Sequence, residues 1–138
     1  MKSMLILRIA FMGLFLAGLS FTGSEGQLYA QSGISDNVLF GVPQGAFVSK
    51  EVASSRIDDA IAPFKVQMEL LDPHSPQYKE AHAQYTYMIA VQNYFLNGKT
   101  VPESIGEGLK DIAAPDAFGL SRNTLLTYKQ QVVNLLKV

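Results

Sequence analysis

The stretch from Ser75 to Gly98 constrains the fold more than any other part of the chain. Ser75 can cap the free backbone N–H groups at a helix start, and Pro76 suits the first helical position because an N–H there has no partner. At the other end, Asn97 and Gly98 tolerate the left-handed conformation that closes many helices. We therefore predict one uninterrupted helix over residues 76–96, at the centre of a small bundle.

This helix is apolar around most of its circumference. At roughly 100° per residue, one side collects Tyr78, Ala81, Tyr85, Met88, Ile89, Phe95 and Leu96. Three further residues extend the apolar arc past a half-turn, namely Tyr87, Val91 and Tyr94. The remaining polar strip contains Lys79, Thr86, Asn93 and Asn97, with His82 at its edge. A helix that is apolar over so wide an arc needs several neighbours to cover it.

Residues 1–30 have the pattern of a cleaved signal peptide. Lys2 and Arg8 supply positive charge, residues 9–19 form an apolar run, and residues 20–30 are rich in small side chains. We expect cleavage after Ala30, with Gly26 as the second choice. The alternative is an uncleaved membrane anchor, which is the weaker interpretation because the apolar run is shorter than the roughly 20 residues of a spanning helix. No stable membrane anchor is expected after cleavage.

The absence of cysteine narrows the compartment and the chemistry. Without cysteine the chain forms no disulfide, no thiolate metal site and no cysteine nucleophile. Small exported eukaryotic domains usually carry disulfides, so a cysteine-free exported domain favours a bacterial protein, periplasmic or secreted. Lys and Arg number 11 against 12 Asp and Glu, and this near-neutral balance argues against nucleic acid as a partner.

Residues 31–48 show no helical period and are predicted to form an extended N-terminal arm. In this interpretation Leu39, Phe40 and Phe47 cover the end of the bundle. Pro43 and Gly45 suit a turn, so a short β-hairpin is the alternative. We favour the arm because an isolated two-stranded hairpin is only marginally stable.

The helical bundle is predicted to span residues 49–138. A first helix begins at Ser49 and continues with a kink through Pro63, with an apolar stripe of Val52, Ile57, Ala60, Ile61, Phe64, Met68 and Leu71. Only residues 72–75 separate it from the central helix. So short a link predicts an antiparallel helical hairpin.

Two shorter helices follow the central one. Thr100 and Glu103 form the sequence signature of a capping box, and Ser121 starts the last helix. Gly106 and Gly108 have two interpretations: they let another backbone approach closely, or they mark a poorly formed helix. The predicted class is therefore all-α, a small three- to four-helix bundle built on an antiparallel hairpin, preceded by a cleaved signal peptide and an extended arm.

The search for chemistry finds no catalytic constellation. His82 borders the polar strip, but no second histidine or glutamate stands at a spacing typical of metal ligands. We therefore predict no catalytic residues, no metal site, no cofactor and no enzymatic activity.

The tyrosines are the unusual feature of the chain. Most of their rings are expected to pack in the bundle with hydroxyls at its rim. Tyr is also enriched at protein interfaces, and Tyr87 and Tyr94 lie away from the Tyr78–Tyr85 side of the helix. The first hypothesis is an exported, non-enzymatic helical module that binds another protein or itself through Tyr87 and Tyr94. The alternative is a periplasmic bundle that binds a small ligand or cofactor near Tyr85, Met88 and His82.

Overall fold

The computed structural model describes residues 34–43 and 45–138, and Ser35–Val138 form one compact unit. The predicted signal peptide, residues 1–30, and residues 31–33 of the predicted arm lie outside the described residues. Within the described residues, no helix is both long and apolar enough to cross a membrane.

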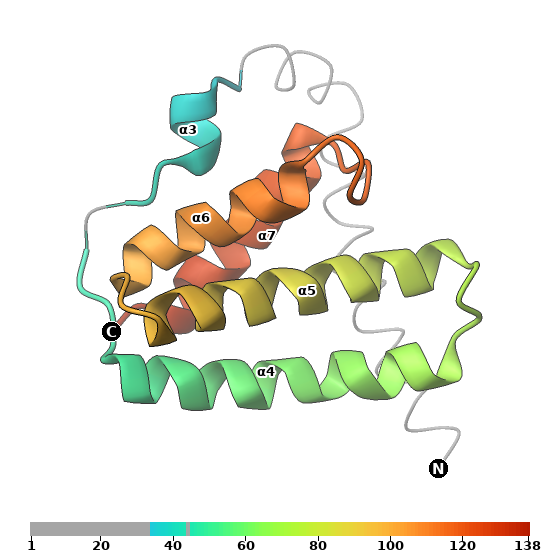
Figure 1. Ribbon diagram of the computed structural model, residues 1–138, viewed down its shortest axis with the longest axis horizontal. Coiled ribbons are helices and arrows are strands. Elements are labelled where there is room, and N and C mark those ends of the chain that lie inside the picture. The colour runs from blue at the N-terminus through green and yellow to red at the C-terminus, as the bar shows by residue number, and fades with distance from the viewer. Residues whose placement is uncertain (1–33, 44) are drawn as a thin grey trace. The chain divides into compact units, whose positions relative to one another are not determined.

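The unit consists of helices, which confirms the all-α class. Along the chain they are α3 (Asp36–Phe40), α4 (Lys50–Leu70), α5 (Pro76–Leu96), α6 (Val101–Ala113) and α7 (Arg122–Leu136). The described part of the chain holds no strand beyond an isolated antiparallel bridge between Phe47 and Lys137. Figure 1 shows α4 and α5 side by side in opposite directions, with α6 against the other side of α5. α7 packs against α6 and α4.

The α4 and α5 helices begin at the predicted caps. The side-chain oxygens of Ser49 and Ser75 accept bonds from the backbone N–H groups three residues ahead. α4 runs through Pro63 as a single helix. Between the two helices, Gln92 Nε2 donates to Ser54 Oγ and to Asp58 Oδ1, both at 2.9 Å.

The prediction placed the centre of the buried side of α5 at the wrong position around the helix. The side chains that the fold buries on α5 are Ala81, Ala83, Gln84, Tyr87, Met88, Val91 and Phe95. Tyr78, Tyr85 and Ile89 are only half-buried and Leu96 is exposed, although all four were assigned to the core side. The predicted polar strip does lie outward, with Lys79, Asn93 and Asn97 exposed. The core is therefore centred near Tyr87, where α6 packs.

Gly108 explains why α6 packs on this side. A Cβ atom at Gly108 would lie 2.9 Å from Val91 Cγ2 and 3.2 Å from the Val91 backbone nitrogen. Contacts this short are available only to a residue without a side chain, so glycine lets the two helix backbones approach closely. A Cβ at Gly106 would likewise lie 2.9 Å from the Phe40 carbonyl oxygen. α6 is a continuous helix, so the close-approach interpretation was right and the poorly formed helix was wrong.

The arm differs from the prediction. Residues 36–40, expected to be extended, form the short helix α3, whose first free N–H groups are capped by the Ser35 side chain. The hairpin alternative is also not seen in the described residues, because Phe47 pairs with Lys137 at the C-terminal end instead. Leu39 is buried, as expected for a residue that covers the bundle.

One residue of the predicted core stripe of the first helix, Val52 of α4, is exposed, and Ala53 is buried in its place.

The capping box of α6 is confirmed. Glu103 N–H donates to Thr100 Oγ1 at 3.2 Å, and Thr100 N–H donates to Glu103 Oε1 at 3.0 Å. The hydrogen bond from the Thr100 backbone N–H lowers the pKa of the Glu103 carboxyl most, and the hydrogen bond to the Thr100 side chain lowers it further.

Replacing Thr100 by alanine is expected to lower the free energy of unfolding by about 1 kcal/mol, because the first turn of α6 loses its cap.

The lowered pKa of Glu103 also makes the stability depend on pH. The ionised Glu103 stabilises the fold above its ordinary value of 4.5, and this contribution is lost as the pH falls through the lower folded-state value. Urea titrations at pH 7 and pH 3 measure both effects. Glu103→Gln should have a smaller difference between the two pH values than the unmodified protein, and an unchanged difference would contradict this role.

Candidate functional site

Tyr87 lies in the core and not at the surface. Its side chain is only 1 % exposed, and its hydroxyl donates a hydrogen bond to the Ile105 carbonyl oxygen at 3.0 Å. Burial raises the pKa of this hydroxyl. Because both the ring and the hydroxyl are used within the fold, Tyr87 is not available to a partner from solution. Tyr87 therefore does not contribute to the surface of the unit.

Tyr94 lies at the solvent-facing edge between α5 and α6. Its hydroxyl donates to Asp111 Oδ2 at 2.9 Å and lies 3.2 Å from Asp111 Oδ1. This bond raises the pKa of the Tyr94 hydroxyl, and the nearby Glu107 carboxylate adds to the effect. Tyr87 and Tyr94, which were expected to share a patch, are thus separated between the core and the rim.

His82 and Tyr85 lie on a different side of α5. The His82 side chain is exposed, and its ring contacts the Tyr78 ring at a centroid distance of 5.8 Å and the Phe118 ring at 5.3 Å. Met88, proposed to share a ligand pocket with His82, is buried in the core. The two side chains therefore point to different sides of the helix and do not line one pocket.

The incompletely covered side of α5 forms a continuous stripe. We call it the α5 stripe; its members are Tyr78, His82, Tyr85, Ile89 and Leu96. Steps of four, three, four and seven residues keep these side chains within an arc of about 60°. Leu96 is 59 % exposed, His82 is exposed, and the other three are half-buried. This spacing is the one with which one helix packs lengthwise against another.

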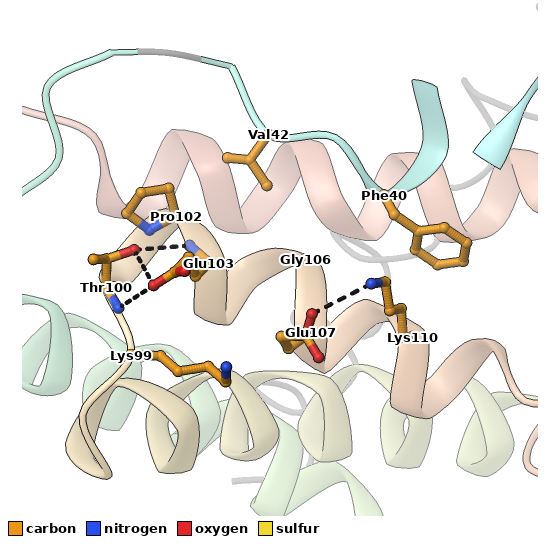
Figure 2. Close-up of a pocket in the computed structure, with 9 residues that line it drawn as sticks. All are labelled: Phe40, Val42, Lys99, Thr100, Pro102, Glu103, Gly106, Glu107 and Lys110. Carbon is orange, nitrogen blue, oxygen red and sulfur yellow. Dashed lines mark hydrogen bonds and ion pairs between the residues drawn. The ribbon is translucent and has the colours of Figure 1, made fainter. Parts of the chain in front are cut away.

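A groove lies on the opposite part of the unit, between α6 and the segment that contains α3. It has a volume of about 420 Å³, and its apolar walls come from Phe40, Val42, Pro102 and Gly106. Figure 2 shows Phe40 and Val42 on one side of the groove and the charged residues of α6 along the other. The charged lining residues are Lys99, Glu103, Glu107 and Lys110, and Lys110 Nζ lies 3.3 Å from Glu107 Oε2. Four charged side chains at an open rim make this groove more polar than a typical small-molecule pocket.

Burial shifts the pKa of three further side chains. Burial raises the pKa of Tyr128 to about 12 and also raises the pKa of Glu80, while burial lowers the pKa of Lys129. A tyrosine shifted in this direction stays protonated at neutral pH and is a poor general base. Across residues 34–43 and 45–138, no three His, Cys, Asp or Glu side chains are grouped so that they could hold a metal ion.

Comparisons of the chain with protein-family models, with curated proteins and with solved structures found no match.

Sequence reasoning missed the groove. Its walls come from residues about 60 positions apart in the chain, and no short motif connects them. The available signal was the pair Gly106 and Gly108, because a glycine in a helix often marks close approach of another backbone. That signal predicted a contact, but not that the arm would be the segment at Gly106.

Proposed function

We propose that this chain is an exported, non-enzymatic helical module that acts by self-association, with the α5 stripe as the contact surface. The observation that carries this proposal is that α5, the central helix of the unit, keeps a lengthwise apolar stripe incompletely covered by its neighbours. Two of the four candidate residues, His82 and Tyr85, belong to it.

The chemistry of the stripe fits a second copy of itself. A two-fold symmetric contact places the same surface on both partners, so each residue must match its counterpart's neighbours. Aromatic and aliphatic side chains such as Tyr85, Ile89 and Leu96 satisfy this condition because they pack against one another without requiring opposite charges. Tyr78 and Tyr85 can also keep their hydroxyls in water at the edge of such a contact.

Export is the second part of the proposal and comes from residues 1–30. Cleavage after Ala30 would leave a mature chain that begins a few residues before Ser35, the first residue of the compact unit. Mass spectrometry of the protein recovered from a bacterial periplasm or medium tests this part directly. A mature N-terminus at Gln31 or Gln27 is expected, and an uncut N-terminus would contradict it.

Leu96→Asp is expected to weaken self-association of the purified protein by at least tenfold in the dissociation constant, because it places a charge on the stripe. Leu70→Asp is the matched control, since Leu70 is 56 % exposed on the separate helix α4. Both substitutions exchange a leucine of similar exposure for aspartate, so they change the net charge by the same amount. Sedimentation velocity over a concentration series measures the difference. Equal dissociation constants for the two variants would contradict contact through the stripe.

The alternative is a small-ligand binder, and the groove beside Gly106 favours it through its volume, which falls in the range of ligand sites. A ligand that binds only the folded protein raises the thermal midpoint. A thermal-shift panel of small molecules, haem and divalent metals therefore distinguishes the two functions. Stabilisation that Val42→Asp removes and Leu96→Asp leaves intact would support the groove over the stripe.

A further inference from the structure

Lys129 of α7 is a buried charge whose bonding partners are unusual. The side chain is only 5 % exposed, and Nζ donates to the carbonyl oxygens of Val38 at 2.8 Å and Gly41 at 2.6 Å. Among the described residues it forms no ion pair. A buried ammonium without an anion is unstable unless hydrogen bonds compensate it. Here the compensation comes from carbonyl groups at the C-terminal end of α3, where the helix carries partial negative charge.

The segment that supplies these carbonyls, residues 35–42, is called the strap from here on. Its helix α3 has only five residues, too few to be stable alone in water. The strap is held by the buried Leu39, by Lys129 and by an exposed ion pair between Arg122 Nη2 and Asp36 Oδ1 at 2.7 Å. Exposed ion pairs contribute little. The strap therefore depends on Leu39 and Lys129, and Lys129 depends on the strap.

On its C-terminal side, the strap is connected to α4 through exposed residues. After Gly41 the chain passes through Pro43, Gly45 and Ala46, which are exposed, and a Cβ at Gly45 would meet nothing within 4 Å. The next attachments are the hydrogen bonds of Val48 N–H to Leu136 O and Val138 N–H to Ala46 O. On the other side, the cleavage proposed above leaves only a few residues before Ser35. The strap would then be a free N-terminal end.

We propose that the strap exchanges between two copies of this chain, so that residues 35–42 of each copy dock on α6 and α7 of the other. A strap that lifts from its own site takes the Val38 and Gly41 carbonyls away from the Lys129 ammonium, and the strap of a second copy restores the same two hydrogen bonds. Exchange of an identical element is a low-cost route to a dimer. This inference rests on the proposed export and self-association, but it uses a surface distinct from the α5 stripe.

A complementation experiment tests strap exchange independently of the stripe. Both chains are produced at full length and carry Leu96→Asp, which removes association through the stripe. One chain also carries Lys129→Met, which damages the docking site and keeps the strap. The other also carries Leu39→Asp, which damages the strap and keeps the docking site. In a mixed dimer, the intact strap of the first chain can dock on the intact site of the second.

The two chains are unfolded, refolded together and examined by native mass spectrometry. We expect mixed dimers to be at least fivefold more abundant than either homodimer. Dimer yields equal to those of the separate chains would overturn strap exchange. Loss of association with Leu96→Asp alone, without complementation, would leave the proposed function standing and remove only this inference.

Deletion of Gly45 provides a second measurement in which the strap and its docking site are both intact. A shorter tether hinders the strap from returning to its own site, and short hinge loops favour exchange. We expect the dimer fraction to rise at least threefold in the Leu96→Asp background. A monomer whose residues 36–41 show increased hydrogen exchange would overturn the proposal, because the strap would then be released without being exchanged.

Discussion

Replacing Tyr87 by alanine is expected to lower the free energy of unfolding by about 4 kcal/mol, the largest effect of any single substitution considered for this protein. The ring lies in the core, where α5 meets α6, and the hydroxyl bonds to the Ile105 carbonyl. Alanine would leave a cavity that neighbouring side chains fill only in part. Tyr87→Phe keeps the ring and loses only the hydrogen bond, so a smaller loss of about 1 kcal/mol is expected.

Tyr85→Ala is the matched control for Tyr87→Ala. It removes the same side chain from the same helix two residues away, but from a half-buried position. Its expected loss is about 2 kcal/mol or less, because a half-buried ring removes less apolar surface from water. Urea denaturation followed by circular dichroism gives all three values. If Tyr85→Ala is as destabilising as Tyr87→Ala, the assignment of Tyr87 to the core side of α5 is wrong.

Gly108→Val is expected to lower the free energy of unfolding by about 3 kcal/mol. The first added carbon already falls 2.9 Å from Val91 Cγ2 and 3.3 Å from Tyr87 Cε1, and the valine methyl groups extend further. The two helices must separate or the Val91 side chain must leave its position. The gain in helix propensity over glycine, a few tenths of a kcal/mol, is too small to offset this.

Gly45→Val provides the comparison, since a Cβ at Gly45 meets nothing within 4 Å. Its expected effect is within about 0.5 kcal/mol. Thermal and urea unfolding of both variants measure the difference. A Gly108→Val protein as stable as the unmodified chain would contradict the close packing of α5 and α6.

Local signals predicted α4, α5, α6 and α7, but not the short helix α3. Ser49, Ser75, Thr100 and Ser121 all act as caps, and Gly98 has a φ of 112° in the turn after α5. Caps and turn glycines depend on backbone groups a few residues away, so a sequence contains the information they need. The all-α class follows from the same local signals.

The packing around α5 could not be predicted in the same way. An apolar arc wider than a half-turn shows that several helices are needed, but not where each one lies. The arc contains both Tyr85 and Tyr87, and their side chains are equally suited to a core. Of these two tyrosines, Tyr87 is the buried one because Gly108 lets α6 pack closely beside Val91 and Tyr87. This contact joins residues 17 or more positions apart and leaves no periodic pattern.

The arm and its buried lysine were missed for a related reason. Lys129 is buried, although lysine is rarely buried in folded proteins. Its burial depends on the carbonyls of Val38 and Gly41, about 90 residues earlier in the chain. The same interaction stabilises α3, a helix too short to show a period of its own. No local pattern in the sequence indicated the burial of Lys129 or the presence of α3.

Self-association is tested most directly by the mass of the unmodified protein in solution as a function of concentration. Sedimentation equilibrium of the exported chain from micromolar to millimolar concentration measures it without any substitution. Self-association predicts an average mass that rises from that of one chain towards that of two. A single-chain mass at every concentration would contradict self-association through the uncovered side of α5.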